Sequence, residues 1–311
     1  MKNKDLLSIS DLSGIDIHLL LADAVELRAD GWVDILAGKT LALLFEKPSL
    51  RTRVSFELAM KQLGGECLYL SPSEIGLGKR ESARDIAGVL SRYADVLAVR
   101  TFAQETLLEL ARYADIPVIN ALSDFEHPCQ ALADLLTIFD HKESLKGIRL
   151  AYVGDGNNVA RSLLLAGAMV GMDLRLATPE AYALDERTIE LAKEYAHESG
   201  ATILTTTDPH LAAREAEVIY TDTWVSMGQE EEHRERLQAF TGFKVTRELM
   251  DKAAPGAIFM HCLPAHRGEE VAPEVIDSLS SVILDQAENR LHAQKAVLAQ
   301  MLGGAEVASH R

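Results

Sequence analysis

The chain has 311 residues, of which 48% are apolar and 25% are charged, and its formal net charge is −16. This length fits two ordinary domains, and the acidic balance argues against nucleic acid or an anionic membrane as a general partner. No run approaches the ~20 apolar residues that a membrane span needs, and the charged N-terminus shows no signal peptide.

Apolar, strand-like runs alternate with amphipathic helical stretches in the first half of the chain. The pattern predicts strands at residues 40–46, 67–70, 96–100 and 116–120. It predicts helices at residues 49–63, 82–94, 104–113 and 128–140. The first of these helices ends at Gly64-Gly65, a common helix C-terminal signal. Such alternation is typical of a parallel sheet covered by helices on both faces.

The polar segment 141–147 marks a boundary, after which the same alternation starts again. Strands are expected at residues 149–154, 173–178, 202–206, 218–221, 258–262 and 282–284. Helices are expected at residues 159–170, 185–198 and about 287–301. The prediction is an α/β protein of two doubly wound parallel-sheet domains with an interdomain cleft. The domains are 1–145 and 146–286, with the C-terminal helix, 287–311, packing back onto the first. Ligands of such sheets bind at the carboxyl ends of the strands.

The segment Ser49-Leu50-Arg51-Thr52-Arg53 follows the first strand and opens a helix. The first turn of a helix has free backbone N–H groups and a partial positive charge. Hydroxyls and arginines placed there predict a site for phosphate or another compact anion. The alternative is an ordinary N-cap with solvated arginines.

Two further clusters fit the same anion. Arg100 ends a predicted strand. From there its side chain either contacts a bound anion or is an ordinary surface arginine. His127 precedes Pro128 at a helix start, and Gln130 is close enough in sequence to share its side of the helix. An imidazole and a carboxamide there suit a carbonyl oxygen and an amide, although a structural His-Pro loop is also possible.

The segment Gly154–Val159 follows a strand and opens a helix, as dinucleotide-binding loops do. Val159 stands where the third glycine of that motif belongs, which weakens the cofactor interpretation. The paired asparagines in this segment suit a zwitterion, because each amide offers donors and an acceptor.

The second half carries three more polar groups at strand or helix ends. Asp222 follows a strand and suits a substrate ammonium, and Ser226-Met227-Gly228 reads as a loop with a glycine hinge. The charged run 229–236 is interpreted as a solvated helix face. Cys262 ends a predicted strand, and its thiol is interpreted as a nucleophile, a metal ligand or a polar contact. Arg290 starts the last predicted helix.

The cysteines at positions 67, 129 and 262 are scattered, which argues against a disulfide framework and for a reducing, cytoplasmic location. No second Cys or His pair has the spacing of metal ligands. We therefore expect neither a metal nor a cofactor.

These motifs, in this order, resemble those of the carbamoyltransferases, most closely the ornithine branch of that family. The matching segments are Ser49–Arg53, His127–Gln130, Asp222–Gly228, His261–Pro264 and Glu288–Arg290. They span essentially the whole chain. The first two are superfamily motifs, and Asp222–Gly228 with His261–Pro264 is specific to the ornithine branch.

The resemblance implies carbamoyl transfer from carbamoyl phosphate to the δ-amine of L-ornithine, which yields citrulline and phosphate. It implies a homotrimer with sites at subunit interfaces and no bound cofactor. The residues that it assigns to carbamoyl phosphate are Ser49, Leu50, Arg51, Thr52, Arg100, His127, Gln130, Cys262, Leu263 and Arg290. Those that it assigns to ornithine are Asn158, Asp222, Ser226 and Met227. Arg100, His127 and Cys262 are the expected catalytic residues.

The loop 71–81 departs from the family pattern. Gly76 aligns where many relatives carry a Gln or His that reaches the neighbouring subunit's site, and Lys79 or Arg80 would have to substitute for it. Three other functions stay open: transfer to aspartate, putrescine or an N-acylated ornithine; nicotinamide-dependent oxidoreduction at Gly154–Val159; and metabolite binding without catalysis.

Overall fold

The computed structural model describes residues 1, 4–76, 81–225 and 230–303 and divides them into two compact units. The first unit contains residues 1–136 and the segment from 288 onward, and the second contains residues 137–287. Among the described residues, no helix is long and apolar enough to cross a membrane.

The first unit is built on a four-stranded parallel sheet with the strand order β2-β1-β3-β4. Its strands are β1 (Thr40–Phe45), β2 (Glu66–Leu70), β3 (Val96–Arg100) and β4 (Val118–Leu122). Its helices are α1 (Gly14–Asp30), α2 (Leu50–Gln62), α3 (Pro72–Ile75), α4 (Ala83–Leu90) and α5 (Gln104–Tyr113), preceded by the 3-10 turn η1 (Ile9–Asp11).

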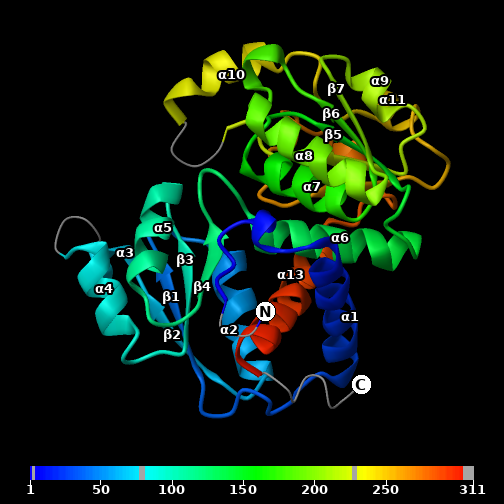
Figure 1. The fold of residues 1–311 in the computed structure, drawn as a ribbon. Helices are drawn as coiled ribbons and strands as arrows, with labels where there is room; N and C mark the ends of the chain where they lie inside the picture. Colours follow the sequence, from blue (N-terminus) through cyan, green and yellow to red (C-terminus); the bar gives the residue numbers. More distant parts are fainter. Residues whose placement is uncertain (2–3, 77–80, 226–229, 304–311) are drawn as a thin grey trace. The chain divides into compact units, whose positions relative to one another are not determined.

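Helices cover both faces of this sheet. Alternate residues of β1 and β3, such as Ala42 and Leu97, pack in one buried cluster with residues of α4 and α5. Helices α2 and α13 (Ile283–Leu298) lie across the sheet from α4 and α5 (Figure 1). On α13, the ammonium of Lys295 donates to the carbonyls of Leu27 and Gly31 at 2.7 and 2.6 Å, which ties this helix to the C-terminal end of α1.

The second unit is built on a five-stranded parallel sheet with the order β7-β6-β5-β8-β9. Its strands are β5 (Arg149–Val153), β6 (Asp173–Ala177), β7 (Thr202–Thr206), β8 (Val218–Thr221) and β9 (Ile258–His261). Its helices are α7 (Asn158–Met169), α8 (Glu186–Ser199), α9 (Pro209–Ala213), α10 (His233–Ala239), α11 (Arg247–Met250) and α12 (Pro273–Ile276), with 3-10 turns η2 (Glu180–Tyr182) and η3 (Glu230–Glu232).

Two helices contain residues of both units. Helix α6 (Pro128–Lys142) passes from the first unit to the second, and α13 passes from the second to the first before the π-helical turn η4 (Ala299–Gly303). The α/β class with two parallel sheets was predicted from the sequence and is confirmed. Our proposed domain boundary at 145/146 falls just after α6.

The predicted strand 282–284 is wrong, because this segment starts helix α13. Only Ser281 makes a single bridge to Phe259, and the Gln286 N–H already donates to the Val282 carbonyl at 2.9 Å. Leu284 is 74% exposed beside the buried Ile283. An apolar run at the start of an amphipathic helix resembles a short strand when only its periodicity is considered.

In both sheets the strand order reverses at a defined point: between β1 and β3 in the first, and between β5 and β8 in the second. Loops leave in opposite directions at such a point, so the carboxyl ends of the two strands open onto a crevice that commonly holds ligands. Of the polar residues singled out in the sequence, Arg51 follows β1, Arg100 ends β3, and Asn158 and Asp222 follow β5 and β8. His127 and Cys262 follow the neighbouring strands β4 and β9.

Candidate active site

The turn after β1 is a helix N-terminus capped by its own sequence. Ser49 has an extended backbone, and its Oγ accepts from the Thr52 N–H at 3.3 Å. The Ser49 hydroxyl also donates to Thr52 Oγ1 at 3.0 Å. Ordinary N-capping is therefore present, as the alternative interpretation held, but it does not use Arg51.

The two arginines of this turn differ in what they contact. Arg53 donates through Nε to Glu57 Oε1 at 2.8 Å, and its guanidinium lies 3.9 Å from the ring centroid of Tyr69. Arg51, which is half-buried, makes no such ion pair among the described residues. Arg51 rather than Arg53 is thus available to an anion.

A chain of hydrogen bonds joins the three helices around this turn. Arg290 of α13 donates to Thr52 Oγ1 at 3.2 Å and to Gln130 Oε1 at 2.6 Å. Gln130 in turn donates to Asp134 Oδ1 at 2.8 Å. Arg290, Gln130 and Asp134 are all buried. Arg290 is 160 positions from Gln130 and 238 from Thr52 in the sequence, and the first unit brings them together.

His127 lies in the same unit, buried, before the first turn of α6. Burial is the main cause that holds its pKa well below the usual range, and the charges of Arg290, Arg100, Lys47 and Arg51 act in the same direction. Both causes disfavour an imidazolium. The ring is therefore neutral at physiological pH, so it can donate one hydrogen bond without adding charge.

Arg100 completes the predicted set in the first unit. It is the last residue of β3, it is buried, and its partner in the sheet register is Phe45 of β1. The crevice of the first sheet is consequently lined by guanidinium groups, hydroxyls and a neutral imidazole. This chemistry suits an anion that also carries a carbonyl group.

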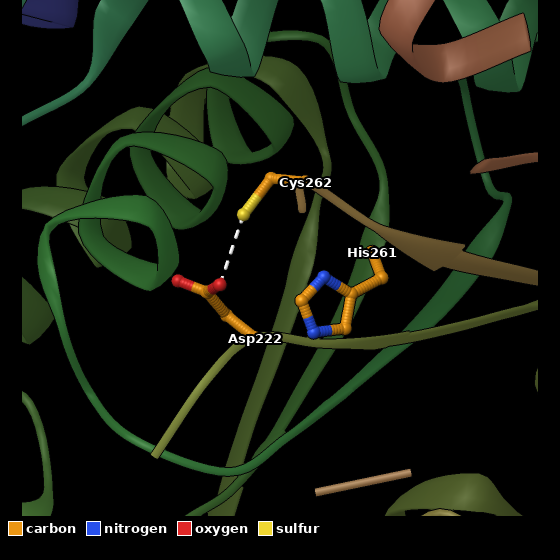
Figure 2. A group of neighbouring side chains, drawn as sticks. All are labelled: Asp222, His261 and Cys262. Carbon is orange, nitrogen blue, oxygen red and sulfur yellow. Dashed lines mark hydrogen bonds between the residues drawn. The ribbon is translucent and has the colours of Figure 1, made fainter. Parts of the chain in front are cut away.

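The second unit places Asp222 directly after β8, at the switch point of its own sheet. Its carboxylate accepts three hydrogen bonds, from the Asn157 amide at 2.7 Å, the Thr223 N–H at 2.8 Å and the Cys262 thiol at 2.9 Å. Figure 2 shows the Cys262 sulfur directed at this carboxylate. A buried carboxylate whose hydrogen-bond donors are neutral suits a substrate ammonium.

The loop Gly154–Val159 does not have the open form that a dinucleotide needs. A Cβ on Gly156 would lie 2.6 Å from the Tyr182 carbonyl oxygen, so this glycine makes room for the protein's own backbone. Asn157 caps α7 by accepting from the Val159 and Ala160 N–H groups at 3.0 and 3.1 Å. The neighbouring Asn158, assigned to ornithine from the sequence, is the first residue of α7 and is half-buried.

Arg236 was missed by the sequence analysis. We interpreted the charged run 229–236 as solvated, which is wrong for this residue because it is buried. Its guanidinium donates to Asp155 Oδ2 at 2.9 Å, to the Trp224 carbonyl at 3.0 Å and to Glu232 at 2.9 Å. Burial still raises the pKa of Asp155 to about 6. This ion pair ties α10 to the two loops that carry Asn157 and Asp222.

His261 is buried and has both ring nitrogens occupied. Its Nε2 lies 3.2 Å from Glu270 Oε1, and its Nδ1 accepts from the Leu263 N–H at 2.9 Å. Donor atoms of Asp222, His261 and Cys262 lie within 4.8 Å of one another, close enough for a metal ion. A metal there would have to displace a hydrogen bond of His261.

Two of the residues discussed from the sequence, Leu50 and Gly76, offer no side chain to the site, and four others lie outside the described residues. Leu50 is 77% exposed and offers only its backbone to the anion turn. Ser226, Met227, Lys79 and Arg80 lie outside the described residues. Gly76 caps α3 in the left-handed region, with φ of 56°, and has no side chain to offer a neighbour.

Comparison with known proteins decides the family. Residues 4–140 match the model of the carbamoyl phosphate-binding domain of aspartate/ornithine carbamoyltransferases, and residues 146–301 match that of the aspartate/ornithine-binding domain. The chain belongs to the aspartate/ornithine carbamoyltransferase family. The family predicted from the sequence motifs is therefore confirmed.

Similar family members fall in the ornithine branch. The chain is 52% identical to the ornithine carbamoyltransferase of Pyrococcus abyssi, covering 98% of this chain and 97% of that protein. It matches the ornithine carbamoyltransferase structure from Pyrococcus furiosus at 51% identity with a TM-score of 0.94, and the match covers 97% of this chain and 98% of that one. The anabolic ornithine carbamoyltransferase structure from Campylobacter jejuni matches at 39% identity with a TM-score of 0.92, and the match covers 99% of this chain and 100% of that one.

Proposed function

We propose that this protein transfers the carbamoyl group of carbamoyl phosphate to the δ-amine of L-ornithine, giving L-citrulline and phosphate. One observation carries the proposal. A chain of this family combines a cationic crevice around neutral His127 in one unit with the buried carboxylate of Asp222 in the other. The first suits carbamoyl phosphate, and the second suits the ammonium of an amino acid.

In this mechanism the residues of the first unit stabilise negative charge. The amine attacks the carbamoyl carbon, a tetrahedral intermediate forms, and its oxygen becomes anionic before the C–O bond to phosphate breaks. Arg51, Thr52 and the α2 N-terminus would hold the phosphate. Arg100 and His127 would donate to the developing oxyanion, and one such donor contributes roughly 3–4 kcal/mol in comparable acyl transfers.

The residues of the second unit would orient the nucleophile. Asp222 would anchor the α-ammonium of ornithine, with Asn158 and the segment around Ser226 and Met227 as further contacts. The δ-amine must be neutral to attack, although the pKa of a free alkyl amine is about 10. Nearby cations and loss of water lower that pKa, and the departing phosphate can accept the proton. Cys262 and Leu263, which the resemblance assigns to the carbamoyl end, stay predictions.

The competing functions fit the site less well. Aspartate would call for cations where Asp222 lies. Putrescine lacks the α-carboxylate and the α-amine that Asn158, Asp222 and Ser226 are proposed to bind. Oxidoreduction at Gly154–Val159 loses its basis because Gly156 packs against backbone. Names of relatives, including an anabolic one, support a role in arginine biosynthesis.

The decisive assay compares acceptors. Product formation from carbamoyl phosphate is measured with ornithine, aspartate, putrescine and N-acetylornithine under identical conditions. We expect citrulline formation to exceed every other product by a wide margin in kcat/KM. A better rate with another acceptor would contradict the substrate assignment, while activity with none would contradict the function itself.

We further propose a cytoplasmic homotrimer. Helix α2 supports the assembly, because Leu50, Val54 and Leu58 recur every fourth residue and are 77%, 41% and 39% exposed. An exposed apolar stripe of this kind is typical of an interface between subunits. Sedimentation velocity should give the mass of three chains or a multiple of it, and a monomer at micromolar concentration would contradict the proposal.

A further inference from the structure

Three side chains with metal-binding atoms gather in a tight turn of the second unit, between β9 and α12. Gly268 has a left-handed backbone with φ of 96°, and the Glu269 N–H donates to the His266 carbonyl at 2.9 Å. The Val245 N–H holds the turn by donating to the Glu270 carbonyl at 2.9 Å. In this turn, ligand atoms of His266, Glu269 and Glu270 all lie within 4.8 Å of one another.

The two carboxylate oxygens of Glu270 differ in what they contact. The residue is fully buried. Its Oε1 lies 3.2 Å from His261 Nε2 and accepts from the His266 N–H at 2.5 Å. Its Oε2 is buried without a hydrogen-bond partner among the described residues, and the 3.8 Å to His266 Nδ1 is too long for such a bond. A buried carboxylate oxygen in this state costs free energy that a ligand would recover.

The buried Glu126 of the first unit shows how this chain satisfies a carboxylate with its own groups. Glu126 is 1% exposed. Its Oε1 accepts from the Ser8 hydroxyl at 2.6 Å, and its Oε2 accepts from the Ile9 N–H at 2.9 Å. The unused oxygen of Glu270 therefore indicates a ligand from outside the chain.

The other two side chains of the cluster are accessible from solvent. The side chain of His266 is 47% exposed and that of Glu269 is 31% exposed. His266 Nδ1 lies 3.0 Å from Thr223 Oγ1, and its Nε2 has no partner among the described residues. Glu269 Oε1 lies 3.4 Å from His233 Nε2. An ion can thus enter from solvent, and these two side chains have room to move toward it.

We propose that His266, Glu269 and Glu270 form a binding site for a divalent cation such as Zn²⁺. Imidazole and carboxylate both bind zinc, and open zinc sites commonly have three protein ligands and one water. Carboxylates that bind metals are themselves hydrogen-bonded as a rule, and Glu270 meets this condition through His261. The Cys and His spacing in the sequence did not predict this site, because two of its three ligands are glutamates.

The proposed site differs from the other group of potential ligands, which is Asp222, His261 and Cys262. In that group the Cys262 thiol donates to Asp222 at 2.9 Å, and both ring nitrogens of His261 are occupied. A metal would have to break these contacts. At Glu270 it would meet an oxygen that has no hydrogen bond to lose.

The experiment titrates Zn²⁺ into the metal-free, full-length protein by calorimetry. The test variants are His266→Asn and Glu269→Gln. The matched controls are His197→Asn and Glu105→Gln, which change exposed residues of α8 and α5. Cys262→Ser separates the proposed site from the group around Asp222, and Co²⁺ spectra show whether a thiolate is bound, because that ligand adds a charge-transfer band.

We expect the wild type to bind one Zn²⁺ per subunit at the proposed site. Each test variant should weaken this binding about tenfold or more, since even the outer-shell partners of metal ligands contribute that much. The two controls and Cys262→Ser should keep the wild-type affinity. The Co²⁺ spectrum should lack a thiolate band, and Zn²⁺ should raise the Tm of the wild type more than that of Glu269→Gln.

No binding by the wild type overturns the inference, as does unchanged affinity in Glu269→Gln. Loss of binding in Cys262→Ser, or a thiolate band with Co²⁺, overturns it as well, because the ion would then lie beside Asp222. The comparison of Glu269→Gln with Glu105→Gln decides the question even if His266→Asn fails to fold. None of these outcomes depends on carbamoyl transfer.

Discussion

The crevices at the carboxyl ends of the two sheets differ in how their charged side chains are partnered. In the first unit, cations gather around a neutral histidine, and Arg51 and Lys47 form no ion pair among the described residues. In the second unit, the two carboxylates near the switch point have partners within the protein. Asp222 accepts three hydrogen bonds, and Asp155 pairs with Arg236.

The difference corresponds to what each crevice is proposed to bind. A phosphate dianion brings two negative charges, which match the positive charges gathered around His127. An amino acid brings charges of both signs. Its site must hold one carboxylate in a fixed orientation, and neutral donors such as Asn157 and Cys262 do so without cancelling the charge.

The largest effect should come from Arg51→Ala. This change removes the one arginine of the anion turn that is available for binding, and we expect kcat/KM for carbamoyl phosphate to fall about 10³-fold. The KM for ornithine at saturating carbamoyl phosphate should change little. Steady-state kinetics with each substrate varied separately test this, with a sedimentation profile like that of the wild type as the control for folding.

Asp222→Asn should act on the other substrate. The amide has nearly the same shape but no charge, and its NH₂ group would face the donors Asn157 and Cys262. We expect kcat/KM for ornithine to fall about 10²-fold, while the KM for carbamoyl phosphate is retained. An equal loss for both substrates would show that the two crevices do not divide the substrates as proposed.

The pH dependence distinguishes the histidine from the substrate amine. Because burial and neighbouring cations hold the pKa of His127 well below its usual range, the ring does not titrate between pH 6.5 and 9. At saturating carbamoyl phosphate, kcat/KM for ornithine should therefore rise with pH as the δ-amine loses its proton.

His127→Gln provides the matching variant. It should lower kcat about 10²-fold, as expected for one lost oxyanion donor, and leave the shape of this pH profile unchanged. An inflection near pH 6.5 in the wild type that disappears in the variant would contradict a permanently neutral imidazole.

The smallest effect is expected for Arg53→Ala, two residues from Arg51. Its guanidinium is occupied by Glu57 and Tyr69, and an exposed ion pair of this kind contributes only about 0–1 kcal/mol to stability. The kcat and the KM for carbamoyl phosphate should stay within about twofold of the wild-type values. A loss comparable with that of Arg51→Ala would mean that the turn works as a diffuse basic patch.

Much of the fold could be read from the sequence because the chain repeats one simple pattern. Buried strands such as Val96–Arg100 are continuous apolar runs, and helices such as α2 carry their own caps. Polar residues directly after strands identified both crevices, since open parallel sheets bind ligands there. Arg51, Arg100 and Asp222 were found in this way.

The sequence could not show which charges meet in space. Arg51 and Arg53 look equivalent until Glu57 and Tyr69 are seen to occupy Arg53. Arg236 reads as one more solvated charge, because its partner Asp155 lies 81 positions away.

The division of the two substrates is tested most directly by equilibrium binding of inorganic phosphate to the wild type, Arg51→Ala and Asp222→Asn. We predict that Arg51→Ala raises the Kd about 100-fold or more, while Asp222→Asn leaves it within about twofold. Unchanged phosphate affinity in Arg51→Ala, or an equal loss in Asp222→Asn, would contradict the assignment of the phosphate to the cationic crevice of the first unit.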